Sequence, residues 1–315
     1  MCANENIVPC ALFAFNRPDK LERVLSALKP QDIDRLIVFV DGPRDDADVE
    51  LVERCRTIAK GVDWVDKELY LGEQNRGLPG LSDNVSMVLN VYETAVFVED
   101  DCLPMPAFYS FMRRALSHYE PEKKVFSIGG YQPIPHRYFK DYPYSLVSSA
   151  RFLCWGWATW QDRWEVVTPY LSKYRELFDG LMNVPDIAGH DLATMARSSD
   201  SWDVKVVIST LWLEQVHLLP TRGLVRNIDL IGGTHKASGR KVQSRQRSHN
   251  RNVYEGPLEN IVWLDNVELN SDYAERLKQF VKGPGQAPRR KLWPRAKVNL
   301  RRKVPGFIKG WLSGS

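Results

Sequence analysis

The 315-residue sequence contains no apolar run that approaches the roughly 20 residues needed to cross a bilayer as a helix. Cysteines are few, scattered and odd in number, without the close spacing of a metal site. They are Cys2, Cys10, Cys55, Cys102 and Cys154. The first residues lack the pattern of a secretory signal. These features favour a reducing compartment, and we expect a cytoplasmic protein.

Acidic residues are missing from the end of the chain: residues 282–315 hold ten Lys or Arg and no Asp or Glu. Without those ten, the rest of the chain has 33 basic against 39 acidic residues, a net charge of −6. An acidic body argues against nucleic-acid binding. Basic residues of the tail alternate with apolar ones such as Trp293 and Trp311, which is typical of a segment on an anionic membrane surface. We expect the tail to lie on the inner face of the cytoplasmic membrane; the alternative is a solvated, unstructured tail.

The apolar content, 43%, is enough for a substantial packed core. In the first half, apolar runs alternate with helical patterns. We predict strands at 7–15, 36–40, 65–70 and 95–99, and helices from Asp19 and over 49–60 and 81–91. This alternation predicts an α/β fold with a Rossmann-like, mostly parallel sheet flanked by helices. Each predicted strand ends in polar or turn residues, so the candidate site residues collect along one edge of the sheet.

The second half is less regular and contains an aromatic-rich region over residues 131–164. We predict helices at 104–119, 172–182 and 202–215, short strands at 125–129 and 223–227, and a polar, basic loop at 236–252. The expected organisation is one domain over residues 1–282, with a first half at about 1–130 and a second half at about 131–282. The basic tail covers 283–315.

Three consecutive carboxylates, Glu99, Asp100 and Asp101, follow the apolar run at 95–98. They therefore sit at the carboxyl end of a predicted buried strand, where open α/β sheets bind their ligands. Three neighbouring acids repel one another unless a cation neutralises them. Hard oxygen ligands of this kind suit Mg²⁺ or Mn²⁺, which in turn can bind a diphosphate. An acidic turn without a ligand is the other interpretation of the same pattern.

Five short segments occur in a specific order along the chain. They are Ala-Phe-Asn-Arg-Pro at 14–18, Phe-Val-Asp-Gly at 39–42, Asn-Arg-Gly-Leu at 75–78, Phe-Val-Glu-Asp-Asp at 97–101 and Gly-Trp-Ala-Thr-Trp at 156–160. Over roughly residues 7–240, this combination resembles GT-A-fold nucleotide-sugar glycosyltransferases. It is most similar to bacterial enzymes related to N-acetylglucosaminyltransferase I, whose metal motif is also Glu-Asp-Asp, and to family 2-like transferases.

The resemblance implies that the half at about 1–130 is the donor half and the half at about 131–282 the acceptor half. It gives donor-binding roles to residues at the ends of the first strands. Phe15, Asn16 and Arg17 leave the first strand where family members receive the nucleotide, and the planar fork of Arg17 suits a phosphate. Asp41 would accept the N3–H of a uracil, so a UDP-sugar is the expected donor. Arg76 precedes a helix whose N-terminus would face the donor.

The resemblance also implies the metal ligands. Asp101, the last acid of the triplet, would coordinate Mn²⁺ or Mg²⁺ directly, while Glu99 and Asp100 would bind the donor sugar, the ribose or metal-bound waters. His235, in a late glycine-flanked loop, would contact the metal or the diphosphate. The ring of Trp157 would face the donor or acceptor sugar, because aromatic faces stack on sugar rings.

An inverting transfer needs a base that takes the proton of the acceptor hydroxyl. Asp203 resembles the base of a Trp-Asp-Asp segment in the N-acetylglucosaminyltransferase relative, although Val204 replaces the second Asp of that pattern. Asp191 is the alternative base, and Glu165 is a third candidate.

The expected function is therefore an inverting, metal-dependent glycosyltransferase, hexosyl or N-acetylhexosaminyl. Its acceptor would be a hydroxyl of a glycan or lipid-linked glycan in bacterial surface polysaccharide or glycolipid assembly. A sugar nucleotidyltransferase is the alternative, but such enzymes place a glycine-rich basic loop after the first strand, where this chain has Phe15-Asn16-Arg17-Pro18. A non-catalytic carbohydrate-binding protein would have no use for the acidic triplet.

Overall fold

A computed structural model describes residues 7–180, 188, 196–197, 200–229, 253–256 and 259–282. Four sequence predictions lie outside these residues: the roles of Asp191 and His235, the basic loop at 236–252, and the tail at 283–315. Within the described ranges, no helix is both long enough and apolar enough to pass through a membrane.

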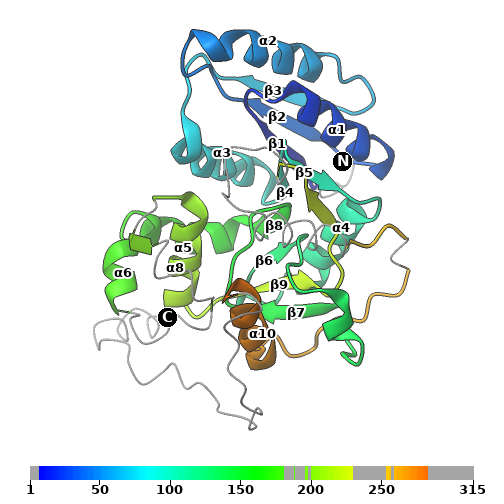
Figure 1. Ribbon diagram of the computed structural model, residues 1–315, viewed down its shortest axis with the longest axis vertical. Helices are drawn as coiled ribbons and strands as arrows, with labels where there is room; N and C mark the ends of the chain where they lie inside the picture. The colour runs from blue at the N-terminus through cyan, green and yellow to red at the C-terminus, as the bar shows by residue number, and fades with distance from the viewer. Residues whose placement is uncertain are drawn as a thin grey trace, which may run out of the picture.

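The centre of the molecule is an eight-stranded sheet with the strand order β3-β2-β1-β4-β8-β6-β9-β7 (Figure 1). Its pairs β3–β2, β2–β1, β1–β4 and β6–β9 are parallel, and the other three are antiparallel. The predicted α/β class with a mostly parallel sheet is confirmed. The strands are β1 (Cys10–Ala14), β2 (Leu36–Val40), β3 (Lys67–Leu71), β4 (Thr94–Glu99), β6 (Val125–Gly129), β7 (Leu146–Ser149), β8 (Trp157–Trp160) and β9 (Val216–Pro220). A separate antiparallel ribbon joins β5 (Cys102–Pro104) to β10 (Val225–Asn227).

Helices cover both faces of the sheet, because the strands bury both sets of their alternating side chains. One core cluster joins the sheet to α1 (Pro18–Leu28), α2 (Asp46–Lys60) and α4 (Phe108–Tyr119). The cluster on the opposite face contains α3 (Gly77–Tyr92), α5 (Gln161–Leu171), α6 (Tyr174–Gly180) and α8 (Trp202–Trp212). A third cluster packs α10 (Ser271–Lys282) on β7 and β9. Two short 3-10 helices, η1 (Lys29–Gln31) and η2 (His136–Phe139), complete the described elements.

Local chemistry explains where the first helices begin. Pro18 occupies the first turn of α1, where its missing N–H removes no hydrogen bond. The predicted second helix begins three residues earlier than expected, at Asp46. Its N-cap is Asp45, whose carboxylate accepts the backbone N–H of Ala47 at 3.1 Å.

The largest difference from the prediction is β8, which the sequence analysis did not predict. This strand lies between β4 and β6 and runs antiparallel to both, with Trp157 paired to Phe97 and to Gly129. A strand of four residues has little periodicity of its own, and its place depends on neighbours about 30 to 60 residues away in sequence. The helix predicted from residue 104 also begins later, at Phe108, because Pro104 belongs to β5.

Candidate functional site

The candidate site lies where β1, β2 and β4 end side by side. The backbone N–H of Asp41 donates to the carbonyl of Ala14, and that of Asp100 donates to the carbonyl of Phe13, each at 2.9 Å. These bonds bring the polar residues that follow β2 and β4 next to the end of β1. The predicted gathering of polar residues along one edge of the sheet is therefore present in the structure.

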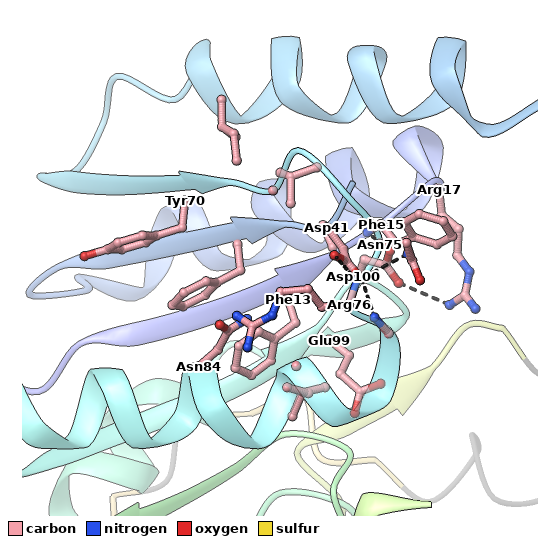
Figure 2. A pocket seen from close by; sticks show the side chains of 18 of the residues that line it. Phe13, Phe15, Arg17, Asp41, Tyr70, Asn75, Arg76, Asn84, Glu99 and Asp100 are labelled. Atoms are coloured by element: carbon pink, nitrogen blue, oxygen red, sulfur yellow. Dashed lines mark hydrogen bonds and ion pairs between the residues drawn. The ribbon is translucent and has the colours of Figure 1, made fainter. Parts of the chain in front are cut away.

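A pocket of about 570 Å³ opens at this edge and continues between the sheet and α3 (Figure 2). One wall consists of Phe13, Phe39 and Tyr70, which are cross-strand neighbours on β1, β2 and β3. The ring centroids of Phe13 and Phe39 lie 5.3 Å apart, and Phe39 stacks on Tyr70 at 4.9 Å. Tyr70 remains 40% exposed, so the wall offers an aromatic face to a flat ligand.

Side chains of α3 line the opposite side of the pocket. Leu81, Asn84 and Met87 belong to this lining, and Asn84 brings a side-chain amide to it. The sequence analysis named neither Tyr70 nor Asn84 as a site residue. Side chains alternate between the two faces of the sheet along β3, so Tyr70 could have been found once the register of β3 against β2 was known. Nothing in the sequence distinguishes Asn84.

The carboxylate of Asp41 caps the start of α3. It accepts the backbone N–H groups of Arg76 and Gly77, both at 2.9 Å, and the side-chain amide of Asn75 at 3.0 Å. Its Oδ1 also accepts the N–H of Gly42 at 3.0 Å. In this arrangement the carboxylate is occupied by protein donors, and it holds the loop before α3 rather than presenting free lone pairs to a base.

Glycine is required at two positions next to the Asp41 carboxylate, one after β2 and one at the start of α3. Gly77 has a φ of +57°, in the left-handed region that favours glycine. A Cβ on Gly42 would lie 2.5 Å from the backbone N and C of Gln74, where no real Cβ fits. Arg76, which the sequence analysis assigned to the donor, lines the pocket and forms an exposed ion pair with Asp83.

The residues after β1 point in different directions. Phe15 and Arg17 line the pocket, but Asn16 does not; its amide donates to Asp48 on α2 at 2.6 Å. Arg44 also donates to Asp48 through Nε at 2.6 Å. This hydrogen bond, followed by that of Asn16, holds the pKa of Asp48 below its usual value, although burial acts in the opposite direction. The Arg44 guanidinium lies 5.0 Å from the centre of the Phe15 ring. Asn16 therefore supports the wall of the pocket instead of lining it.

Arg17 joins the two acids that follow β4. Its Nη1 lies 3.1 Å from Asp100 Oδ1 and 3.1 Å from Asp101 Oδ2. Both acids are nearly buried, with 5% and 8% of their surface exposed. Burial raises the pKa of Asp100 to about 6, although Arg17 acts in the opposite direction.

Glu99, like Asp100, lines the pocket (Figure 2). Burial raises its pKa well above the usual value, and the charges of Asp101 and Asp100 raise it further. Asp203 contributes to the same shift. The charge of Asp203, in the first turn of α8, therefore acts on Glu99 although the two are far apart in sequence.

The donor set at the end of β4 consists of carboxylate oxygens that converge on one cation, at present Arg17 Nη1. Oxygen ligands of this kind fit Mn²⁺ or Mg²⁺. In the part of the chain that the structure describes, no three His, Cys, Asp or Glu side chains form a group able to hold a metal by themselves. The residues therefore fit an open site, in which protein carboxylates supply part of the coordination and phosphate oxygens and waters supply the rest.

Trp157 does not occupy the position expected from the sequence. Its side chain is 1% exposed and stacks on Phe97 with a centroid distance of 4.7 Å. Phe152 and Trp202 pack against the same ring. Because a strand at the centre of the sheet directs this ring into the core, Trp157 presents no face to a sugar.

The solved structures that this chain resembles include the following three. A mannosyltransferase, PcManGT from Pyrobaculum calidifontis in complex with GDP-Man and Mn²⁺, is 15% identical with a TM-score of 0.37. S. aureus TarS 1–349 is 13% identical with a TM-score of 0.40, and GalNAc-T7 with UDP, GalNAc and Mn²⁺ is 9% identical with a TM-score of 0.40. The matches cover 50%, 69% and 69% of this chain, and 45%, 59% and 42% of the matched chains. This chain thus spans about half the length of those proteins.

No protein-family model matches the chain, and no curated protein matches it in sequence.

Proposed function

We propose that this chain is an inverting, metal-dependent glycosyltransferase of the GT-A type. It would transfer a sugar from a nucleotide-diphosphate sugar to a hydroxyl group of a glycan or lipid-linked glycan. The observation that carries the proposal is the pair of strand-end carboxylates, Asp100 and Asp101, held against the Arg17 guanidinium, with Asp100 and Arg17 lining an aromatic-walled pocket. This arrangement supports a cation site and an anion-binding side chain beside a surface for a flat base.

The pocket supports a division of roles along its length. The wall of Phe13, Phe39 and Tyr70 takes the base, which stacks on Tyr70, the exposed ring of the three. Asp41 holds the loop before α3 in place and so shapes the pocket at the edge of the sheet. Arg17 meets the diphosphate. A divalent cation bound by Asp101 supplies neutralisation of the charge that develops on the departing nucleoside diphosphate.

Asp203 is the proposed base. It sits in the first turn of a helix, and the hydroxyl of Ser201 donates a hydrogen bond to it. The effect of its charge on Glu99, which lines the pocket, supports this role. There it would take the proton of the acceptor hydroxyl as the oxygen attacks the anomeric carbon. Asp191, outside the described residues, is the alternative base.

A screen of nucleoside diphosphates and nucleotide sugars with Mn²⁺ tests this function. We expect one nucleoside diphosphate, UDP by the resemblance, to raise the thermal unfolding temperature in the presence of Mn²⁺ and much less without it. The corresponding sugar nucleotides would then be tested for hydrolysis and transfer. A flat response to every nucleotide, with and without Mn²⁺, would contradict the proposal.

We also propose that the tail at 283–315 brings the enzyme to a lipid-linked acceptor in bacterial surface polysaccharide or glycolipid assembly. The support is its composition, because each basic residue near an anionic surface contributes about 1 kcal/mol and apolar residues add insertion. The full chain should sediment with anionic liposomes at low salt, whereas a chain ending at residue 282 should stay in the supernatant. Equal recovery of the two chains in the supernatant would remove the support for membrane binding.

A further inference from the structure

The guanidinium of Arg17 occupies the space between the two carboxylates of the candidate metal site. A single nitrogen, Nη1, lies 3.1 Å from an oxygen of Asp100 and 3.1 Å from an oxygen of Asp101 (the Asp100 bond is drawn in Figure 2). A divalent cation coordinated by Asp101 would need the space that this nitrogen fills. The two cations cannot occupy it together, because they repel one another at such distances.

A third carboxylate holds the other side of the same guanidinium. Asp229 Oδ2 lies 3.6 Å from Arg17 Nη2, and Asp229 Oδ1 accepts a hydrogen bond from the ammonium group of Lys20. Asp229 is 8% exposed, and the sequence analysis did not name it. Lys20 lies one turn after Arg17 at the start of α1, so Asp229 contacts two cations from the same helix.

The backbone fixes the position of Asp229. Its N–H donates to the side-chain oxygen of Asn227 at 2.9 Å, and the N–H of Ile228 donates to the carbonyl of Asp101 at 2.8 Å. Asn227 is the last residue of β10, which pairs with β5 directly after the acidic triplet. The carboxylate of Asp229 is therefore held at a constant place relative to Asp101, on the far side of Arg17.

We infer that Arg17 is an internal counter-cation of the metal site, that a divalent metal displaces its Nη1 from Asp100 and Asp101, and that Asp229 retains the displaced guanidinium beside the site. This inference rests on the proposed function. The displaced nitrogen then gains a partner when a diphosphate binds, because phosphate oxygens accept the bonds that the carboxylates gave up. Asp229 and Lys20 are positioning residues in this arrangement.

A coupling between metal and nucleotide follows from this exchange. Without a diphosphate, metal binding breaks the charge-assisted bonds of Arg17 to Asp100 and Asp101 and no new partner replaces them. The metal therefore binds weakly. With a diphosphate, Arg17 keeps a full set of partners, so each ligand favours the binding of the other, and the coupling is reciprocal. The protein would thus avoid holding the metal when no donor is present.

Titration of the protein with Mn²⁺ alone, followed by the signal of free Mn²⁺ in electron paramagnetic resonance, tests the inference. Arg17→Gln removes the competing cation, and we expect it to bind Mn²⁺ about tenfold more tightly than the wild type. The same variant should bind UDP in the presence of Mn²⁺ more weakly, because its phosphate partner is lost. The matched control is Arg54→Gln, which removes one positive charge from an exposed ion pair with Asp19 and should change neither affinity.

Asp229→Asn provides a second, independent readout. We expect Mn²⁺ alone to bind no more tightly than in the wild type, while the factor by which UDP tightens Mn²⁺ binding falls at least about threefold, because Arg17 is no longer retained beside the site. Should Arg17→Gln fail to fold, Arg17→Lys serves instead, since a single ammonium group cannot reproduce the fork of the guanidinium. Its Mn²⁺ affinity should also rise, by a smaller factor.

Two results would overturn the inference in distinguishable ways. If the wild type binds UDP with Mn²⁺ but Arg17→Gln binds Mn²⁺ alone no better than the wild type, the competition is wrong and the proposed function stands. If no variant and no wild-type sample binds Mn²⁺ with or without UDP, the metal site itself is wrong and both proposals fail.

Discussion

The carboxylate of Asp41 accepts the backbone N–H of Gly77 at 2.9 Å, which joins the end of β2 to the first residue of α3, 36 positions later in the chain. The same carboxylate accepts the N–H of Arg76 and the amide of Asn75. One side chain therefore sets both the start of a helix and the rim of the pocket. A change at Asp41 should affect stability and ligand binding together.

We expect Asp41→Ala to lower the free energy of unfolding by about 1–2 kcal/mol, because several backbone and amide donors lose their acceptor. Asp41→Asn should be milder, since its amide oxygen replaces one of the two carboxylate oxygens. Urea unfolding measures both effects. Asp45→Ala is the matched control: Asp45 caps α2 through a single N–H at an exposed position and does not line the pocket, so the change should leave nucleotide binding unchanged. Similar losses of binding in the two Ala variants would contradict the assigned role.

Asp101→Asn tests the metal site directly. We expect the variant to lose at least about tenfold in affinity for UDP in the presence of Mn²⁺, because a neutral amide is a poorer ligand for a hard cation. Its unfolding temperature should change little, since relief of the repulsion with Asp100 offsets the loss of the ion pair with Arg17. Calorimetric titration gives the affinity. Asp66→Asn, a change at an exposed carboxylate paired with Arg35, is the control and should bind as the wild type does. Unchanged affinity in Asp101→Asn would remove this residue from the metal site.

Asp203→Asn separates the base from the donor site. A base acts on the proton of the acceptor, so we expect donor affinity to persist while turnover falls by about 10²- to 10⁴-fold. Glu165→Gln is the comparison, because Glu165 was the third candidate for this role and binds Gln161 on the exposed side of α5. Turnover like that of the wild type in Asp203→Asn, together with a loss in Asp191→Asn, would transfer the role to Asp191.

Because of His217, we expect the free energy of unfolding to decrease as the pH falls below about 6.5. This ring is fully buried between the hydroxyls of Ser127 and Thr210, at 2.9 and 3.1 Å, and burial lowers its pKa from 6.5 to about 3. Between these values the unfolded chain binds a proton that the native ring does not. The contribution of His217 to stability is therefore complete above pH 6.5 and is lost as the pH falls toward 3, by about 1.4 kcal/mol per pH unit.

Urea unfolding of the wild type and of His217→Gln between pH 5 and 8 measures this slope as a difference between the two proteins, in which the other titrating groups cancel. The imidazole signals in nuclear magnetic resonance give a second measurement that needs no variant. A His217 ring that titrates near pH 6.5 in the native protein would contradict its burial.

The sequence predicted those parts of the fold whose signal is local. The strands β1, β2 and β4 are uninterrupted apolar runs that end at turn residues, and α1 repeats Leu21, Val24, Leu25 and Leu28 on one buried face. The acidic triplet was visible for the same reason, since its position after β4 follows from the chain itself. Parallel strands then bring such strand ends to one edge of the sheet.

The tertiary structure decided the features that depend on contacts between distant parts of the chain. Four residues starting at Trp157 have no periodicity that identifies a strand, and only pairing with β4 and β6 makes them β8. That pairing buries Trp157, although its sequence context was typical of a sugar-stacking residue.

The candidate site likewise has features that the sequence determined and features that only folding decided. Composition and order along the chain by themselves determined that carboxylates and a guanidinium stand at strand ends, because each follows a locally recognisable strand. The partners of those groups were decided by folding alone: Asp229 pairs with Arg17, and the charge of Asp203 acts on Glu99, each across more than 100 residues of sequence. The orientation of a charged side chain depends on its distances to the buried charges around it. The order of residues along the chain does not specify those distances.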